Sequence, residues 1–104
     1  MIKLNQPFYF PFCQEGYWPT VYDAIEEMRK IRNRGHKIDV YKNINDAVRV
    51  AETTVMDYET WIVAEIKVDE EHVIVGMAQN NDYKPIELDK LERNLVQNFR
   101  VHDA

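Results

Sequence analysis

The sequence lacks several of the residues and patterns on which common kinds of protein chemistry depend. Its 104 residues include no serine, one cysteine (Cys13) and three glycines (Gly16, Gly35 and Gly76). Without serine there is no serine nucleophile, and three scattered glycines cannot form a GxGxxG or GxxxxGK phosphate loop. One cysteine excludes an intrachain disulfide and is typical of the reducing cytoplasm. No window of about 18 apolar residues exists, so we expect no transmembrane helix and a cytoplasmic location.

Metal and cofactor motifs are also missing. The three histidines, His36, His72 and His102, are far apart in the chain and form no HxxxH, HExxH or Cys/His grouping. Zinc sites need clustered ligands, so the sequence predicts no metal and no cofactor. We therefore expect a protein that is not an enzyme.

The composition that is present fits one ordinary folded domain. Hydrophobic residues make up 45% of the chain and charged residues 30%, and twelve aromatic residues can fill a compact core. The length predicts a single domain over residues 1–104. The formal net charge of −5 favours solubility and disfavours non-specific binding to nucleic acid or to an anionic membrane.

The first half of the chain predicts an extended segment, a helix, a strand and a second helix. Residues 2–12 alternate, with phenylalanines on one side, but Pro7 and Pro11 interrupt them and predict an edge strand or an extended arm. Thr20 and Asp23 have capping-box spacing, and Gly35 is suited to the helix end. The apolar stripe of this helix is Val21, Ile25, Met28 and Ile31.

The remaining elements are predicted in the same way, from alternation for strands and from helical spacing of apolar residues for helices. Residues 37–41 alternate as a strand, and Asn43 or Asn45 begins a helix that ends near Met56. Residues 61–68 and 72–78 predict a hairpin with Ile62, Ala64, Ile66 and Val68 inward, and residues 84–88 a short strand. A last helix follows the capping-box pair Asp89 and Glu92, with the inner stripe Leu91, Leu95 and Phe99.

This order, β-α-β-α-β-β-(β)-α, predicts the α+β class. We expect a mixed sheet of four to five strands with three helices. The helices between successive early strands predict right-handed parallel crossovers, and the later hairpin is antiparallel.

An aromatic segment is the most unusual feature of the sequence. Seven of the fifteen residues from 8 to 22 are Phe, Tyr or Trp. They can form core, or they can form a contact surface, because aromatic residues are enriched at the centres of interfaces. The candidate protein-binding or self-association residues are Tyr9, Tyr17, Trp18 and Tyr22.

A basic cluster provides the second candidate site. Residues 29–37 are rich in basic side chains, and the candidate contacts to phosphate or to an acidic partner are Arg29, Lys30, Arg32 and Arg34. The alternative interpretation is a solvated helix end, where cations complement the helix dipole.

Two resemblances bear on function. Residues 38–41, Ala47, Ala51 and the strand from Trp61 to Val68 followed by Asp69 resemble the middle of small ADP-ribosyltransferase-like folds. That resemblance implies an enzyme but assigns no site residue here. The composition, rich in Ile, Asn, Lys, Asp, Glu and Tyr, resembles that of small phage accessory proteins and of acidic immunity or antitoxin proteins, which are mostly binders.

We therefore expect a small acidic binding protein that inhibits or modulates another macromolecule, with a protein partner that is itself basic. The alternatives are a small nucleic-acid-binding module that uses residues 29–37 and a small enzyme of unknown chemistry.

Overall fold

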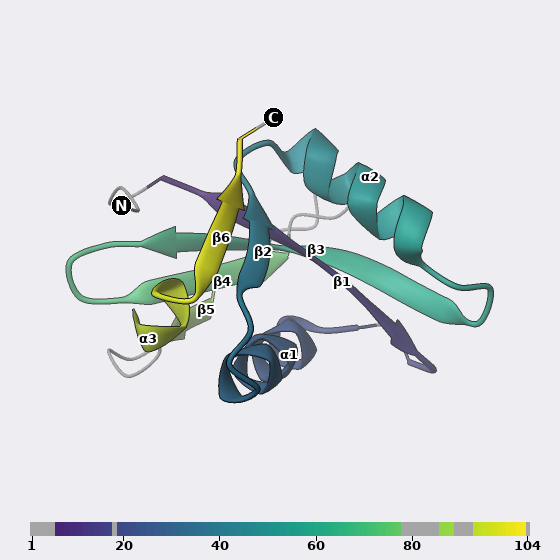
Figure 1. The fold of residues 1–104 in the computed structure, drawn as a ribbon, viewed down its shortest axis with the longest axis horizontal. Helices are drawn as coiled ribbons and strands as arrows, with labels where there is room; N and C mark the ends of the chain where they lie inside the picture. The colour runs from purple at the N-terminus through teal and green to yellow at the C-terminus, as the bar shows by residue number, and fades with distance from the viewer. Residues whose placement is uncertain (1–5, 18, 78–85, 89–92, 104) are drawn as a thin grey trace.

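The computed structural model describes residues 6–17, 19–77, 86–88 and 93–103, which form a twisted mixed sheet with helices on both faces (Figure 1). The elements are β1 (Phe8–Glu15), α1 (Val21–Asn33), β2 (Ile38–Tyr41), α2 (Ile44–Thr54), β3 (Glu59–Val68), β4 (Val73–Met77), β5 (Ile86–Leu88), α3 (Arg93–Val96) and β6 (Phe99–His102). The six strands lie in the order β5-β4-β3-β1-β2-β6. The predicted α+β class, with three helices and a mixed sheet, is confirmed.

Two apolar clusters cover the two faces of the sheet. The larger one joins the buried side chains of α1, such as Ile25 and Met28, to Leu95 of α3 and to one face of β1–β4. The smaller one joins Ala47 and Ala51 of α2 to Val63 on the opposite face of β3. In Figure 1, α2 accordingly lies on one side of the sheet, and α1 and α3 lie on the other.

The two long helices begin and end largely where the sequence predicts. In α1, Thr20 and Asp23 form the predicted capping box, and Gly35 follows the helix with φ of 78°. That positive φ favours glycine because a Cβ would clash with the neighbouring carbonyl. Asn43 is the N-cap of α2: its side chain accepts a hydrogen bond from the N–H of Asn45 at 2.8 Å.

The strand β3 has the predicted register. Ile62, Ala64, Ile66 and Val68 are buried on the side of α1. β3 lies between β1 and β4, and both pairings are antiparallel.

The prediction of an edge strand or extended arm at the start of the chain is wrong. β1 lies inside the sheet, between β3 and β2. It pairs with β3 along its whole length, from Phe8↔Ile66 to Glu15↔Glu59, but in the described residues its pairing with β2 consists of Tyr9↔Tyr41 alone. Pro11 therefore lies where β1 has no hydrogen-bonded neighbour on the β2 side, and the rule that proline avoids doubly paired positions still holds locally.

The topology also differs from the predicted early crossovers. β1 and β2 are antiparallel despite the helix between them, whereas β2 and β3, both antiparallel to β1, are parallel to each other. Because a single bridge joins β1 to β2, the strands β2 and β6 can differ in direction from β1, β3 and β4. In Figure 1, β2 and β6 run steeply across the direction of β1, β3 and β4.

The end of the chain is a strand where the sequence predicts a continuing helix. α3 ends at Val96, and Phe99 begins β6, which pairs in parallel with β2 from Ile38↔Phe99 to Tyr41↔His102. Leu95 is buried as predicted, but Phe99 belongs to the sheet. The capping-box pair Asp89 and Glu92 lies outside the described residues.

None of the helices in the described part of the chain is long and apolar enough to cross a membrane.

Candidate functional site

The exposed tip, defined here as Tyr17, Tyr22, Met56 and Tyr58, contains the large apolar side chains that are most open to solvent among the residues whose burial the structure describes. Their exposed fractions are 89%, 64%, 56% and 61%, respectively. Tyr17 follows the end of β1 and Tyr58 precedes the start of β3, which are paired neighbours at Glu15↔Glu59. Tyr22 lies in the first turn of α1, and the hydroxyl of Tyr58 donates to Sδ of Met56 at 3.4 Å. Two segments far apart in the sequence thus present apolar groups at one end of the sheet.

The backbone beneath Tyr17 is held in place although its side chain is exposed. The carbonyl oxygen of Tyr17 accepts hydrogen bonds from Nε2 of Gln14 at 3.1 Å and from Oγ1 of Thr60 at 3.0 Å. Gln14 and Thr60 are opposite each other in the β1–β3 ladder. After the loop, the N–H of Thr20 donates to Oδ2 of Asp23 at 2.8 Å, so both ends of the connection are fixed.

The two segments that meet at the end of the β1–β3 ladder are acidic. Residues 14–17 and 52–60 together contain no Lys or Arg and four acidic residues: Glu15, Glu52, Asp57 and Glu59. Glu15 and Glu59 are directly opposite in the ladder, and like charges in that position destabilise a sheet. Oε1 of Glu59 accepts the N–H of Met56 at 2.9 Å, which ties this carboxylate to the tip.

Of the four predicted protein-binding residues, Tyr17 and Tyr22 have exposed side chains. Tyr9 lies near the other end of β1, about 20 Å of strand away from Glu15. It is half-buried against Ala47, Ala51 and Val63, and burial, followed by the nearby charge of Glu65, raises its pKa. Trp18 lies outside the described residues. Sequence reasoning missed Met56 and Tyr58, because only the β1–β3 register places them beside Tyr17.

The four predicted basic residues lie in the second half of α1 and just after it, and two of them have partners. Nη1 of Arg29 is 2.5 Å from Oε1 of Glu26, and Nη1 of Arg32 donates to Oδ1 of Asn94 at 2.6 Å. Lys30 and Arg34 are exposed.

A polar cluster that sequence reasoning missed joins β2 to the edge strand β6. Arg100 forms a two-pronged contact with Asp39, with Nε 2.6 Å from Oδ1 and Nη2 3.2 Å from Oδ2. His102 Nε2 is 2.9 Å from the same Oδ1, and its ring stacks on Tyr41 with centroids 4.8 Å apart. The hydrogen bond from Arg100 is the main cause that lowers the pKa of Asp39. Alternation in residues 99–102 was the available signal for this strand.

Other reactive groups have ordinary surroundings. The thiol of Cys13 donates to the carbonyl oxygen of Ala51 at 3.6 Å, and burial raises its pKa. Within residues 6–17, 19–77, 86–88 and 93–103, no three His, Cys, Asp or Glu side chains are grouped so that they could hold a metal ion.

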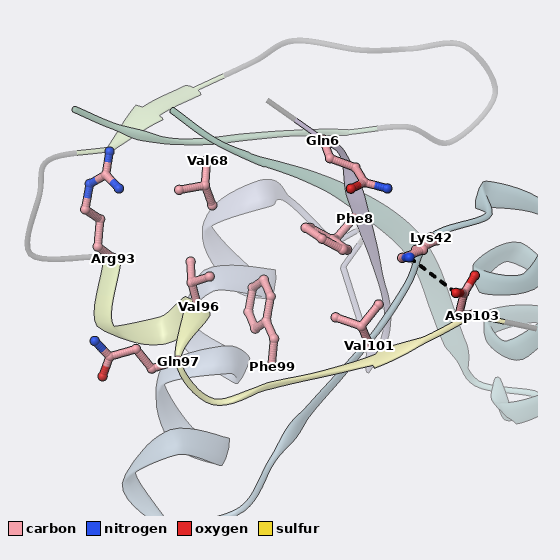
Figure 2. A pocket seen from close by; sticks show the side chains of 10 residues that line it. All are labelled: Gln6, Phe8, Lys42, Val68, Arg93, Val96, Gln97, Phe99, Val101 and Asp103. Atoms are coloured by element: carbon pink, nitrogen blue, oxygen red, sulfur yellow. Dashed lines mark hydrogen bonds and ion pairs between the residues drawn. The ribbon is translucent and has the colours of Figure 1, made fainter. Parts of the chain in front are cut away.

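A hollow in the described surface lies at the opposite end of β1 from the exposed tip. It has a volume of about 710 Å³ and lies between the start of β1, the end of β3, α3 and β6 (Figure 2).

Comparisons of the chain with protein-family models, with curated proteins and with solved structures found no match.

Proposed function

We propose that this protein is a non-enzymatic binding protein that inhibits or modulates a basic protein partner, and that the exposed tip is its contact surface. The observation that carries the proposal is Tyr17, whose side chain is 89% exposed although two hydrogen bonds hold its carbonyl oxygen. A reducing, cytoplasmic setting is part of the proposal, since the one cysteine is a free thiol.

A held backbone makes an exposed tyrosine an efficient anchor. Ordering backbone during association costs free energy, and here Gln14 and Thr60 already hold the backbone of Tyr17, and the capping box holds that of Thr20. A tyrosine side chain has two χ angles, so it offers a large contact area for a small loss of entropy. Tyr58 and Met56, already in contact with each other, extend the apolar area.

The acidic surroundings define the kind of partner. Residues of one charge sign speed the encounter with a surface of opposite sign and repel surfaces of like sign. Glu15, Glu52 and Asp57 are exposed near the tip, and the two segments that meet there have no cation. A basic protein surface complements this arrangement, whereas the phosphates of nucleic acid do not.

The test is affinity measurement on a partner isolated with the native protein as bait from its host. Tyr17→Ala should weaken binding by on the order of 2 kcal/mol, about thirtyfold, because it removes a central aromatic anchor. Its free energy of unfolding should change by less than about 0.5 kcal/mol, since the side chain is exposed. Arg34→Ala, an exposed residue outside the tip, is the matched control and should change neither quantity.

Two results would contradict this proposal. Equal loss of affinity in Tyr17→Ala and Arg34→Ala would exclude the tip as the anchor. Gel-shift binding to nucleic acid that falls steeply with salt and is lost in Lys30→Ala and Arg34→Ala would instead support the nucleic-acid module.

A further inference from the structure

The hollow lies at the start of β1, beside the single bridge that joins this strand to β2. β1 stays paired with β3, while β2 and β6 leave it after the single bridge Tyr9↔Tyr41 and cross at a steep angle. Residues of β1 and β6 line the hollow on the face of the sheet that carries α1 and α3. The four-residue helix α3 lines part of it.

The inside of this hollow is apolar. Phe8, Val68, Val96, Phe99 and Val101 direct their side chains towards its centre (Figure 2). Phe8 and Val68 are buried, whereas the other three remain partly exposed although they pack against the main core. Phe8 and Phe99 meet edge to face, with ring centroids 6.4 Å apart, which fixes the shape of the floor.

The rim is polar, and its charged groups lie at two ends. Figure 2 shows Arg93 at one end and the ion pair of Lys42 with Asp103 at the other. Arg93 is directed away from the centre, because its guanidinium contacts the carbonyl and carboxylate oxygens of Asp69. The cation that can turn to a ligand is therefore Lys42.

The ion pair of Lys42 with Asp103 is weak enough for an anionic group of a ligand to replace the Asp103 carboxylate. Nζ of Lys42 is 3.3 Å from Oδ2 of Asp103, and the Asp103 side chain is 73% exposed. Such surface pairs contribute about 0–1 kcal/mol, so an anionic group on a ligand can take the place of the Asp103 carboxylate. A second, smaller hollow lined by Asn43 and Ile44 also includes Lys42 and gives the anionic group room.

We propose that this hollow binds a small amphipathic ligand, with an aromatic or aliphatic body on the apolar floor and one anionic group at Lys42. Its volume of about 710 Å³ is within the range typical of small-molecule sites, roughly 300–1,000 Å³. An apolar lining with few convergent polar groups is also typical of such sites. This site is independent of the exposed tip, because it lies at the other end of β1.

Two dyes that differ in one charge test the proposal. Anilinonaphthalene sulfonate has an aromatic body and one anionic group, and phenylnaphthylamine has the same body without the charge. Both should bind the native protein saturably at one site, by fluorescence titration. Lys42→Gln should weaken binding of the sulfonate by about fivefold, and Asp103→Asn should strengthen it by about two- to fivefold, since an exposed ion pair is worth up to about 1 kcal/mol. Neither change should alter binding of the neutral dye by more than about twofold.

The controls separate the hollow from the rest of the surface. Arg34→Gln removes an exposed cation elsewhere, and Tyr17→Ala removes the main exposed aromatic, so neither should affect either dye. Val101→Trp fills the hollow and should abolish binding of both dyes. Because that variant could fail to fold, NMR shifts on adding the sulfonate to the native protein give an independent location: they should be largest at Val96 and Val101.

Several results would overturn the proposal. These are no saturable binding of the sulfonate, NMR shifts that are largest at the exposed tip, or an equal effect of Lys42→Gln on the two dyes. Concentration-dependent self-association that is lost in Val101→Trp would assign the hollow to a second copy of the chain instead.

Discussion

The carboxylates of Glu15 and Glu59 provide a test of how charge near the exposed tip affects the free energy of unfolding and the binding of a partner. The two residues are directly opposite in the β1–β3 ladder, so their side chains lie on the same face, with Cβ atoms about 5 Å apart. Two carboxylates about 7 Å apart in water repel each other by about 0.6 kcal/mol. We expect Glu15→Gln to raise the free energy of unfolding by roughly 0.3–1 kcal/mol at low salt, and Glu15→Lys to raise it by more.

A double-mutant cycle isolates this pair from other effects of charge. Glu59→Gln keeps an oxygen that can accept the N–H of Met56, so the contact that Glu59 makes is retained. Each single change should stabilise the fold, and the second change should add little once the first is present. The coupling should be clear in urea unfolding at about 0.01 M salt and nearly absent at 1 M, where the Debye length is only about 3 Å.

The same variants should bind a basic partner more slowly. If the carboxylates attract that partner, Glu15→Gln lowers the association rate at low salt while it raises stability. A cycle with no coupling, or one with coupling that is unchanged at 1 M salt, would refute the argument that the ladder holds two like charges together at the tip.

Two further predictions concern the core and the polar cluster. Ile66→Ala should lower the free energy of unfolding by roughly 2–5 kcal/mol, because this side chain is 1% exposed. The neighbouring Lys67→Ala should cost under about 1 kcal/mol, since the Lys67 side chain is 41% exposed. A larger loss for Lys67→Ala in chemical unfolding would contradict the register of β3. Arg100 lowers the pKa of Asp39 in the folded state below its ordinary value of 3.8, so the unfolded chain binds this proton first as pH falls. The stabilisation from Asp39 is thus present above about pH 4 and is lost as pH falls through the lower folded-state pKa. Urea melts from pH 6 to about pH 2.5 should show a smaller acid-induced loss in Asp39→Asn than in the native protein, and equal losses would exclude this contribution.

Features that depend on neighbouring residues could be predicted from the sequence. The capping box of Thr20 and Asp23 and the turn at Gly35 depend on a few adjacent residues. The alternation of Ile62, Ala64 and Ile66 likewise identifies the buried face of β3, because its period of two matches that of a strand.

Features that depend on distant pairing could not be predicted in the same way. Leu91, Leu95 and Phe99 have helical spacing, yet Phe99 belongs to a strand because β2 offers a parallel partner. At the start of this pairing, the N–H of Ile38 donates to the carbonyl oxygen of Asn98 at 2.7 Å. The single bridge between β1 and β2, which permits Pro11 inside the sheet, is equally non-local.

The fold gathers acidic residues that are distant from one another in the sequence. Along the sequence, 13 basic and 18 acidic residues are interspersed. Pairing of β1 with β3 joins residues 14–17 to the end of segment 52–60, and these residues carry four negative charges and no positive one. The rest of the chain therefore has a net charge of only −1 within a protein of −5. One end of β1 thus attracts cations while Lys42, near the other end, can bind an anion, so a single protein can hold a basic partner and an anionic ligand without competition between them.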